Sequence, residues 1–163
     1  MHWQCHTLTD DFVQRARQYG RDDLGQTVQC LVAAGGEPLR DSLRRARAGE
    51  AILLASYSPF LQAGPYKEYG PVFLAATADT RPLPALGRVL ANGHDYLGEQ
   101  MAVRAYDAAQ TLLDAVIVPR SGLAGQLAAW GDRPEVTTLM LRFAAYGCYA
   151  LQLKRTGRGD VPA

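Results

Sequence analysis

Apolar runs of strand length, joined by short polar links, limit most strongly how this sequence can fold. Residues 51–57 are almost continuously apolar, which is typical of a buried strand, whereas residues 136–145 alternate between faces as a half-buried strand does. Further strands are expected at residues 2–8, 27–32, 72–76, 100–105, 112–118 and 148–154.

Helical signals are fewer. Thr9 in front of two aspartates predicts the N-cap of a helix over residues 10–19, and Ser121 predicts the cap of a second helix over residues 121–130. In residues 38–49 a proline suits a first helical turn, and apolar residues recur at helical spacing, so a third helix is expected. A short fourth helix is expected within residues 84–92.

Strands and helices do not alternate regularly along the chain, which argues against a doubly wound parallel sheet. We therefore predict an α+β fold with a mostly antiparallel or mixed sheet and two to four helices. A length of 163 residues suits one domain, which we place at residues 1–155, followed by a frayed tail at residues 156–163.

Composition excludes several classes of protein. Seventeen Lys and Arg against 16 Asp and Glu leave a net charge of +1, so we expect neither nucleic acid nor a membrane as partner. No apolar run reaches the length of a membrane span, and no leader is evident at the amino terminus. The expected location is the cytoplasm.

No motif predicts a cofactor or a metal. The phosphate-binding, dinucleotide-binding and serine-hydrolase glycine patterns are missing, and the three cysteines form no C-x-x-C pair. His2 and His6 beside Cys5 lack the spacing of a zinc site. Cys148 would act as a nucleophile only with a nearby base or an activating charge, so the alternative is a buried structural thiol.

Arginines next to tyrosines form the first group of candidate binding residues. Arg104 and Arg142 lie inside apolar strands, where an unpaired guanidinium would be costly to bury, so each needs a partner. One interpretation is a pocket in which arginine forks bind a carboxylate or phosphate. The other is structural pairing with Glu50, Glu68 or Asp107, or projection into solvent. The candidate ligand-binding residues are Arg40, Tyr57, Tyr66, Arg104, Tyr106 and Arg142.

The segment 64–71 is the second candidate, because two Gly-Pro steps fix its backbone while it presents Glu68 between two tyrosines. Glu68 would serve as a base or as a pocket wall, and the alternative is a rigid turn into the next strand. The arginines of residues 40–47 are interpreted as the solvated face of the expected third helix.

Five blocks along the chain resemble a known family: PLRDSL, RAGEAILLASYSPF, GPYKEYGPVFL, VRAYDA and RFAAYGCYALQLKR. The chain resembles a bacterial family of uncharacterised proteins of about this length, classified as a domain of unknown function, over residues 30–155. The resemblance implies one conserved fold and supplies no activity. Relatives often carry a cysteine at the position of Leu39 and a histidine at that of Arg142, which weakens any inference of shared cysteine chemistry.

Three functional hypotheses follow. The preferred one is a small-molecule-binding domain with an arginine- and tyrosine-lined pocket for an anionic ligand. The second is an enzyme with Glu68 or Asp107 as acid/base and arginines stabilising negative charge, favoured if the carboxylate is not already neutralised. The third is an interaction protein that forms a homodimer through a strand edge near the amino terminus.

Overall fold

The computed structural model describes residues 3–156, which form two sheets of five strands each. The first, called the β7 sheet, consists in order of β1 (Trp3–His6), β10 (Tyr149–Arg155), β9 (Thr138–Phe143), β7 (Gln100–Tyr106) and β8 (Leu112–Pro119). The second, called the β5 sheet, consists in order of β2 (Gln29–Val32), β5 (Ala51–Tyr57), β6 (Gly70–Ala75), β3 (Pro38–Leu39) and β4 (Arg44–Arg45).

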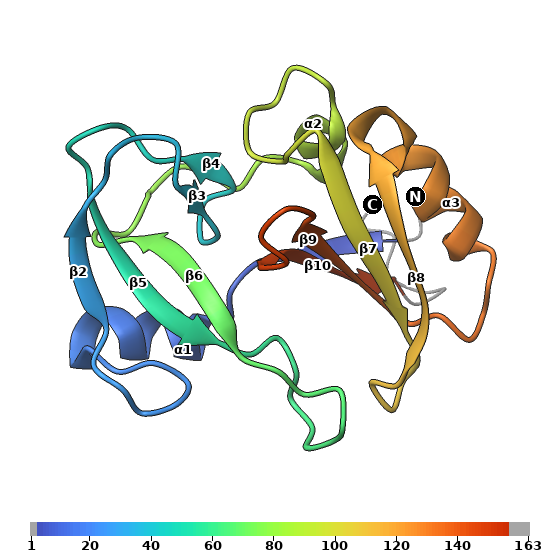
Figure 1. Cartoon of the computed structure of the whole chain (residues 1–163), viewed down its shortest axis with the longest axis horizontal. Coiled ribbons are helices and arrows are strands. Elements are labelled where there is room, and N and C mark those ends of the chain that lie inside the picture. Colours follow the sequence, from blue (N-terminus) through green and yellow to red (C-terminus); the bar gives the residue numbers. More distant parts are fainter. Residues whose placement is uncertain (1–2, 157–163) are drawn as a thin grey trace.

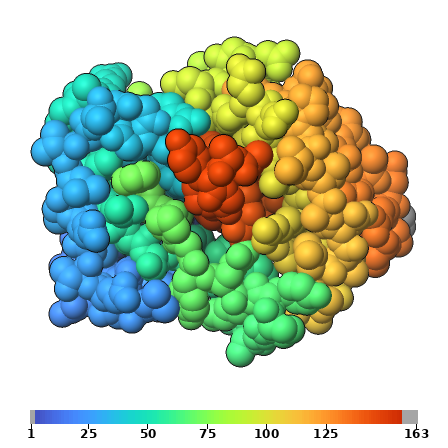
Figure 2. Space-filling view, viewed as in Figure 1, coloured from blue at the N-terminus to red at the C-terminus, as the bar shows by residue number. Residues whose placement is uncertain are grey.

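The sheets lie side by side, and the turn between β9 and β10 reaches toward the β5 sheet (Figure 1). Figure 2 shows this hairpin in orange-red at the centre of one face, between the two halves of the molecule. All pairs in the β7 sheet are antiparallel, whereas β3 and β6 in the β5 sheet are parallel. The expectation of antiparallel or mixed pairing is confirmed. The α+β class holds only roughly, because the chain is rich in sheet and its helices are short.

Three α-helices are present in the described residues. Helix α1 (Asp10–Gln14) continues into a π-helical turn, η1 (Arg15–Tyr19), and Thr9 accepts the N-capping bond from Phe12, as predicted. The second is α2 (Leu86–Leu90). The third, α3 (Leu123–Gly131), follows the 3₁₀ turn η2 (Arg120–Gly122), and its first residue has no side-chain cap, so the cap predicted at Ser121 is wrong.

The helix predicted over residues 38–49 is also wrong. The segment forms β3, a turn and β4, and its backbone bonds join strands: Arg40 N donates to Phe73 O at 2.9 Å, and Ala46 N donates to Glu37 O at 2.8 Å. The apolar residues that suggested a helical stripe are the buried side chains of this folded-back segment, in which Leu43 takes a φ of 51°. Pairing with β6 has overridden a weak helical propensity.

Side chains of β7 alternate between two environments. Met101, Val103 and Ala105 join the main core, to which α3 contributes Leu123, Leu127 and Trp130. On the opposite face of the sheet lie Arg104 and Tyr106. The connection between β5 and β6 covers part of this face, because the Phe60 ring packs edge-on against Tyr106 with centroids 5.4 Å apart.

Two sequence predictions fall at the ends of the chain. Residues 157–163, which make up nearly all of the tail predicted to fray, lie outside the described residues, as does His2. The single-domain boundary at residue 155 stays a prediction.

Candidate functional site

Arg104 and Arg142 project from the same face of the β7 sheet. Arg104 on β7 is opposite Met140 on β9, and Arg142 is opposite Ala102, so the two arginines are diagonal neighbours. Glu68, from the connection between β5 and β6, joins them. Its Oε1 accepts from Arg104 Nη1 at 3.1 Å and also from Arg142 Nη2.

The two arginines differ in burial. The Arg142 side chain is 7% exposed, against 36% for Arg104 and 41% for Glu68. Burial lowers the pKa of Arg142, while the charge of Glu68 acts in the opposite direction. Both guanidiniums bind Glu68, so its negative charge is already paired. The enzyme hypothesis is favoured by a carboxylate without such a partner, and Glu68 does not meet that condition.

Arg142 also connects this pair to Cys148. Its Nη1 donates to Gly147 O at 3.0 Å, in the turn that precedes Cys148. Its Nε is buried and has no hydrogen-bond partner in the described part of the chain. One terminal nitrogen of the Arg142 guanidinium therefore binds Glu68, and the other binds the backbone next to Cys148.

Arg40 approaches Cys148 from the β5 sheet and is only 1% exposed. Its Nε donates to Tyr149 O at 2.9 Å, its Nη1 to Pro38 O at 2.6 Å and its Nη2 to Cys148 Sγ at 3.2 Å. The guanidinium also lies 5.2 Å from the centroid of the Phe143 ring, and so does that of Arg45. We refer to Cys148 with Arg40, Arg45 and Arg142 as the thiol cluster.

The other predicted residues lie in structural surroundings. Tyr57 is buried against Phe12 at a centroid distance of 4.7 Å, and burial raises its pKa to about 12. Asp107 accepts from Thr111 N at 2.8 Å within the turn between β7 and β8. Tyr106 is buried beneath Phe60, whereas Tyr66 is exposed, and no hydrogen bond or ion pair within residues 3–156 joins Tyr66 to an arginine.

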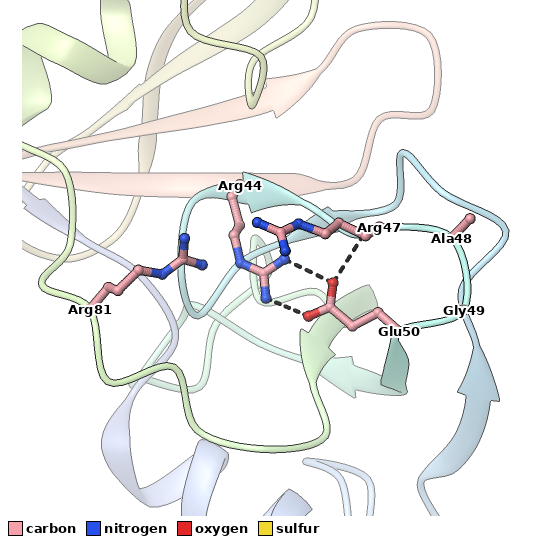
Figure 3. A pocket seen from close by; sticks show the side chains of 6 residues that line it. All are labelled: Arg44, Arg47, Ala48, Gly49, Glu50 and Arg81. Carbon is pink, nitrogen blue, oxygen red and sulfur yellow. Dashed lines mark hydrogen bonds and ion pairs between the residues drawn. The ribbon is translucent and has the colours of Figure 1, made fainter.

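A pocket of about 470 Å³ opens beside β4, at a place where the sequence predicted only a solvated helix face. Figure 3 shows Arg44 and Arg47 next to Glu50 in this pocket, with Arg81 on the other side of Arg44. The lining residues, which we call the arginine pocket, are Arg44, Arg47, Ala48, Gly49, Glu50 and Arg81. In the sequence, the closeness of Arg44 and Arg47 to Glu50 was the one sign of this pocket. The helix wrongly predicted over residues 38–49 placed these arginines on a solvated face instead.

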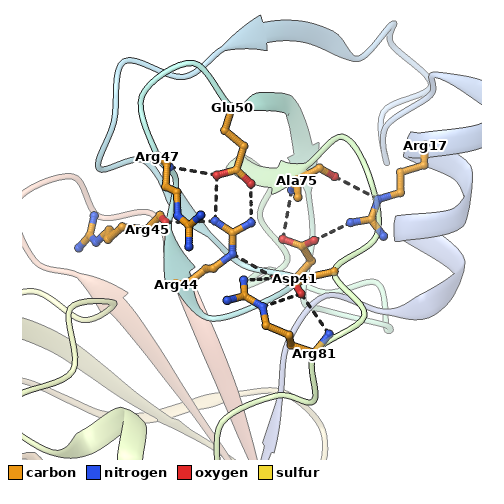
Figure 4. A network of polar contacts seen from close by, with 9 residues as sticks. Arg17, Asp41, Arg44, Arg45, Arg47, Glu50, Ala75 and Arg81 are labelled. Atoms are coloured by element: carbon orange, nitrogen blue, oxygen red, sulfur yellow. Dashed lines mark hydrogen bonds and ion pairs between the residues drawn. The ribbon is translucent and has the colours of Figure 1, made fainter.

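Arg44 is fixed by two carboxylates. It forms a two-pronged pair with Glu50, in which Nη1 lies 2.9 Å from Oε2, and its Nε lies 3.2 Å from Asp79 Oδ2. Arg81 pairs with the same aspartate at 2.6 Å (Figure 4). The bond from Arg44 lowers the pKa of Glu50 to about 2, so both partners are charged at neutral pH.

Arg47 is bound differently. Its backbone N–H donates to Glu50 Oε2 at 3.0 Å, but its guanidinium forms no hydrogen bond or ion pair with any of residues 3–156. Figures 3 and 4 show its side chain extending toward Arg44. Three guanidiniums thus face two carboxylates, Glu50 and Asp79, and the surplus positive charge belongs to Arg47.

No three His, Cys, Asp or Glu side chains in residues 3–156 are grouped to hold a metal ion. No helix in this part of the chain is both long enough and apolar enough to cross a membrane.

Comparison with known families decides the classification. A family described as "Protein of unknown function (DUF1203)" matches residues 36–155, which is most of the chain. The chain belongs to this family. The resemblance inferred from the sequence is confirmed, and the family description assigns no activity. No curated protein and no solved structure matches the chain.

Proposed function

We propose that this member of the family is a binding domain for a small anionic ligand, and that the arginine pocket is its site. The observation that carries the proposal is the unpaired guanidinium of Arg47 in a concave site whose other charges are already paired. An arginine fork binds a carboxylate or phosphate through two parallel N–H bonds. The positive charge of Arg47 therefore attracts an anion into the pocket, and the bound anion becomes the ion-pair partner of Arg47.

The rest of the pocket is prepared for such a ligand. Glu50 and Asp79 hold the Arg44 guanidinium in one orientation, so little side-chain freedom is lost there on binding. Gly49, which lines the pocket, takes a φ of +84° and has no atom within 4 Å of the position of a Cβ, so the space beside it is open. A volume of about 470 Å³ lies within the range of sites for small metabolites.

Exposure of the pocket sets the expected strength of binding. Arg47 and Arg81 are exposed to solvent, so salt screens their attraction for an anion. We expect a ligand with one carboxylate or phosphate group, bound more weakly as ionic strength rises.

The test is a thermal-shift screen of the folded protein against small carboxylates, phosphate and phosphate monoesters, with affinities of hits measured by calorimetry. A ligand at 100 times its Kd stabilises the protein by about 2.7 kcal/mol. Arg47→Gln removes the free guanidinium and should weaken a hit about tenfold or more. The control is Arg88→Gln, which changes an exposed arginine of α2 outside the pocket and should leave the affinity unchanged.

Two results would contradict the proposal. One is a screen in which no anion shifts the unfolding temperature of the protein. The other is a hit whose affinity falls equally in Arg47→Gln and Arg88→Gln, because net charge and not the pocket would then explain binding.

A further inference from the structure

Arg40 carries a buried charge without an anionic partner. Arg40 is only 1% exposed, and arginine does not lose its proton in proteins. Its hydrogen bonds end on two carbonyl oxygens and on Cys148 Sγ, and it makes no ion pair with a carboxylate of residues 3–156. Burying an unpaired charge is costly, so an anion is expected at this position.

The surroundings add positive charge. Arg45 donates to two backbone carbonyls, those of Asp95 and Gly36, and not to a carboxylate. Arg142 is buried, and its Nε still lacks a partner. The guanidinium of Arg45 lies over the same Phe143 ring as that of Arg40. Within residues 3–156, Glu68 is the carboxylate that forms an ion pair with the thiol cluster, and it is shared between Arg142 and Arg104.

Of the three groups in residues 3–156 that accept a hydrogen bond from Arg40, Cys148 is the one that can itself become an anion. The Nη2 of Arg40 points at its sulfur from 3.2 Å, with the sulfur as acceptor. Cys148 packs against the main core and remains partly exposed. Reactive cysteines lie in electropositive, partly exposed surroundings of this kind. A guanidinium does not accept the thiol proton, but it stabilises the thiolate once the proton has left to water.

We propose that Cys148, held beside the guanidinium of Arg40, is a reactive nucleophile, and that it is modified by small electrophiles that carry a negative charge. The sulfur lone pair forms a bond to the electrophilic carbon, and the leaving group departs with the electrons of the bond that breaks. The guanidiniums of the thiol cluster attract the negative group of the reagent. The proposal does not depend on the arginine pocket, which contains none of these residues.

The other two cysteines provide internal controls. Cys30 on β2 is more exposed than Cys148, and Cys5 on β1 packs at the edge of the main core, where burial raises its pKa to about 11. If exposure alone governed reactivity, Cys30 would react first. If the arginines govern it, Cys148 reacts first.

The experiment labels the folded protein with iodoacetate, which is anionic, and with iodoacetamide, which is neutral, near pH 7. Peptide mass spectrometry gives the rate at each cysteine. We expect Cys148 to react faster than Cys30 with both reagents, and its ratio of iodoacetate to iodoacetamide rates to exceed that of Cys30 about fivefold or more. A slower Cys148, or equal ratios at the two cysteines, overturns the proposal.

Variants separate the contributions of the arginines. Arg40→Met should reduce the rate at Cys148 about tenfold or more while the rate at Cys30 stays the same. Because Arg40 is buried and that variant can fail to fold, Arg45→Gln provides a second test. It should lower the preference of Cys148 for iodoacetate, whereas Arg88→Gln should leave that preference unchanged. An unaltered preference in Arg45→Gln contradicts the electrostatic origin of the reactivity.

Discussion

Replacing Glu68 by glutamine tests whether the carboxylate compensates a buried charge. Removing one partner of a fully buried ion pair costs about 3 to 5 kcal/mol, because the other charge is left unpaired. Here the Arg142 side chain is 7% exposed, but that of Glu68 is 41% exposed, so solvent screens part of the effect. We therefore expect Glu68→Gln to lower the free energy of unfolding by about 2 kcal/mol. For a chain of this length, that corresponds to a fall in Tm of about 4 to 8 °C.

Urea unfolding followed by circular dichroism measures the change, with calorimetry as a second probe. The matched control is Arg104→Gln, which breaks the other, more exposed contact of Glu68 and should cost about 0.5 kcal/mol. A double-mutant cycle with Arg142→Met isolates the pair. Once the buried guanidinium is gone, adding Glu68→Gln should cost less than about 0.5 kcal/mol.

The reasoning is refuted if Glu68→Gln costs as much in the Arg142→Met background as in the natural chain. It also fails if Glu68→Gln and Arg104→Gln cost the same, because burial of Arg142 would then make no difference to the stability of the network.

Two further predictions concern buried polar groups. Burial raises the pKa of Tyr57 from 10.0 to about 12, so the folded state keeps a proton that the unfolded state loses. The stability that Tyr57 contributes is fully present below pH 10 and is lost as pH rises through 12, by at most about 3 kcal/mol. The midpoint of urea unfolding should therefore fall less steeply over this pH range in Tyr57→Phe than in the natural chain. Asp22 is buried and accepts from the backbone N–H groups of Leu24 at 2.9 Å, Gln26 at 2.8 Å and Ser56 at 3.1 Å. Asp22→Ala leaves these donors without their acceptor and should cost about 3 kcal/mol in urea unfolding; a loss below about 1 kcal/mol would contradict this account.

Local patterns predicted most of the strands. The run at residues 51–57 is β5 with the same bounds, and the runs predicted as strands at residues 100–105 and 112–118 are β7 and β8. These segments are recognisable because each buries apolar side chains at a spacing set by the backbone alone. The helix predicted over residues 38–49 failed because its apolar spacing fits two conformations, and contact with Phe73 on β6 selects between them.

The candidate sites were harder to predict, because they depend on contacts between distant residues. Arg40 and Cys148 are 108 residues apart, and no periodicity places the residue that follows β3 beside the turn that follows β9. The pairing of Glu68 with Arg104 and Arg142 was among the alternatives raised from the sequence, but choosing it needed the register of β7 and β9. The roles proposed for these residues, the homodimer and the ligand class all stay predictions.

The pairing of β1 with β10 has a consequence for how the chain folds. The strands of the β5 sheet all come from one continuous stretch, whereas Trp3 must find Arg155 to complete the β7 sheet. Closing so long a loop is entropically expensive, so β1 docks late in folding. Until it does, β10 presents an open edge with unpaired N–H and C=O groups. We expect that two folding copies that meet at this stage would exchange β1, so strand swapping is the route to dimers that we predict from this topology.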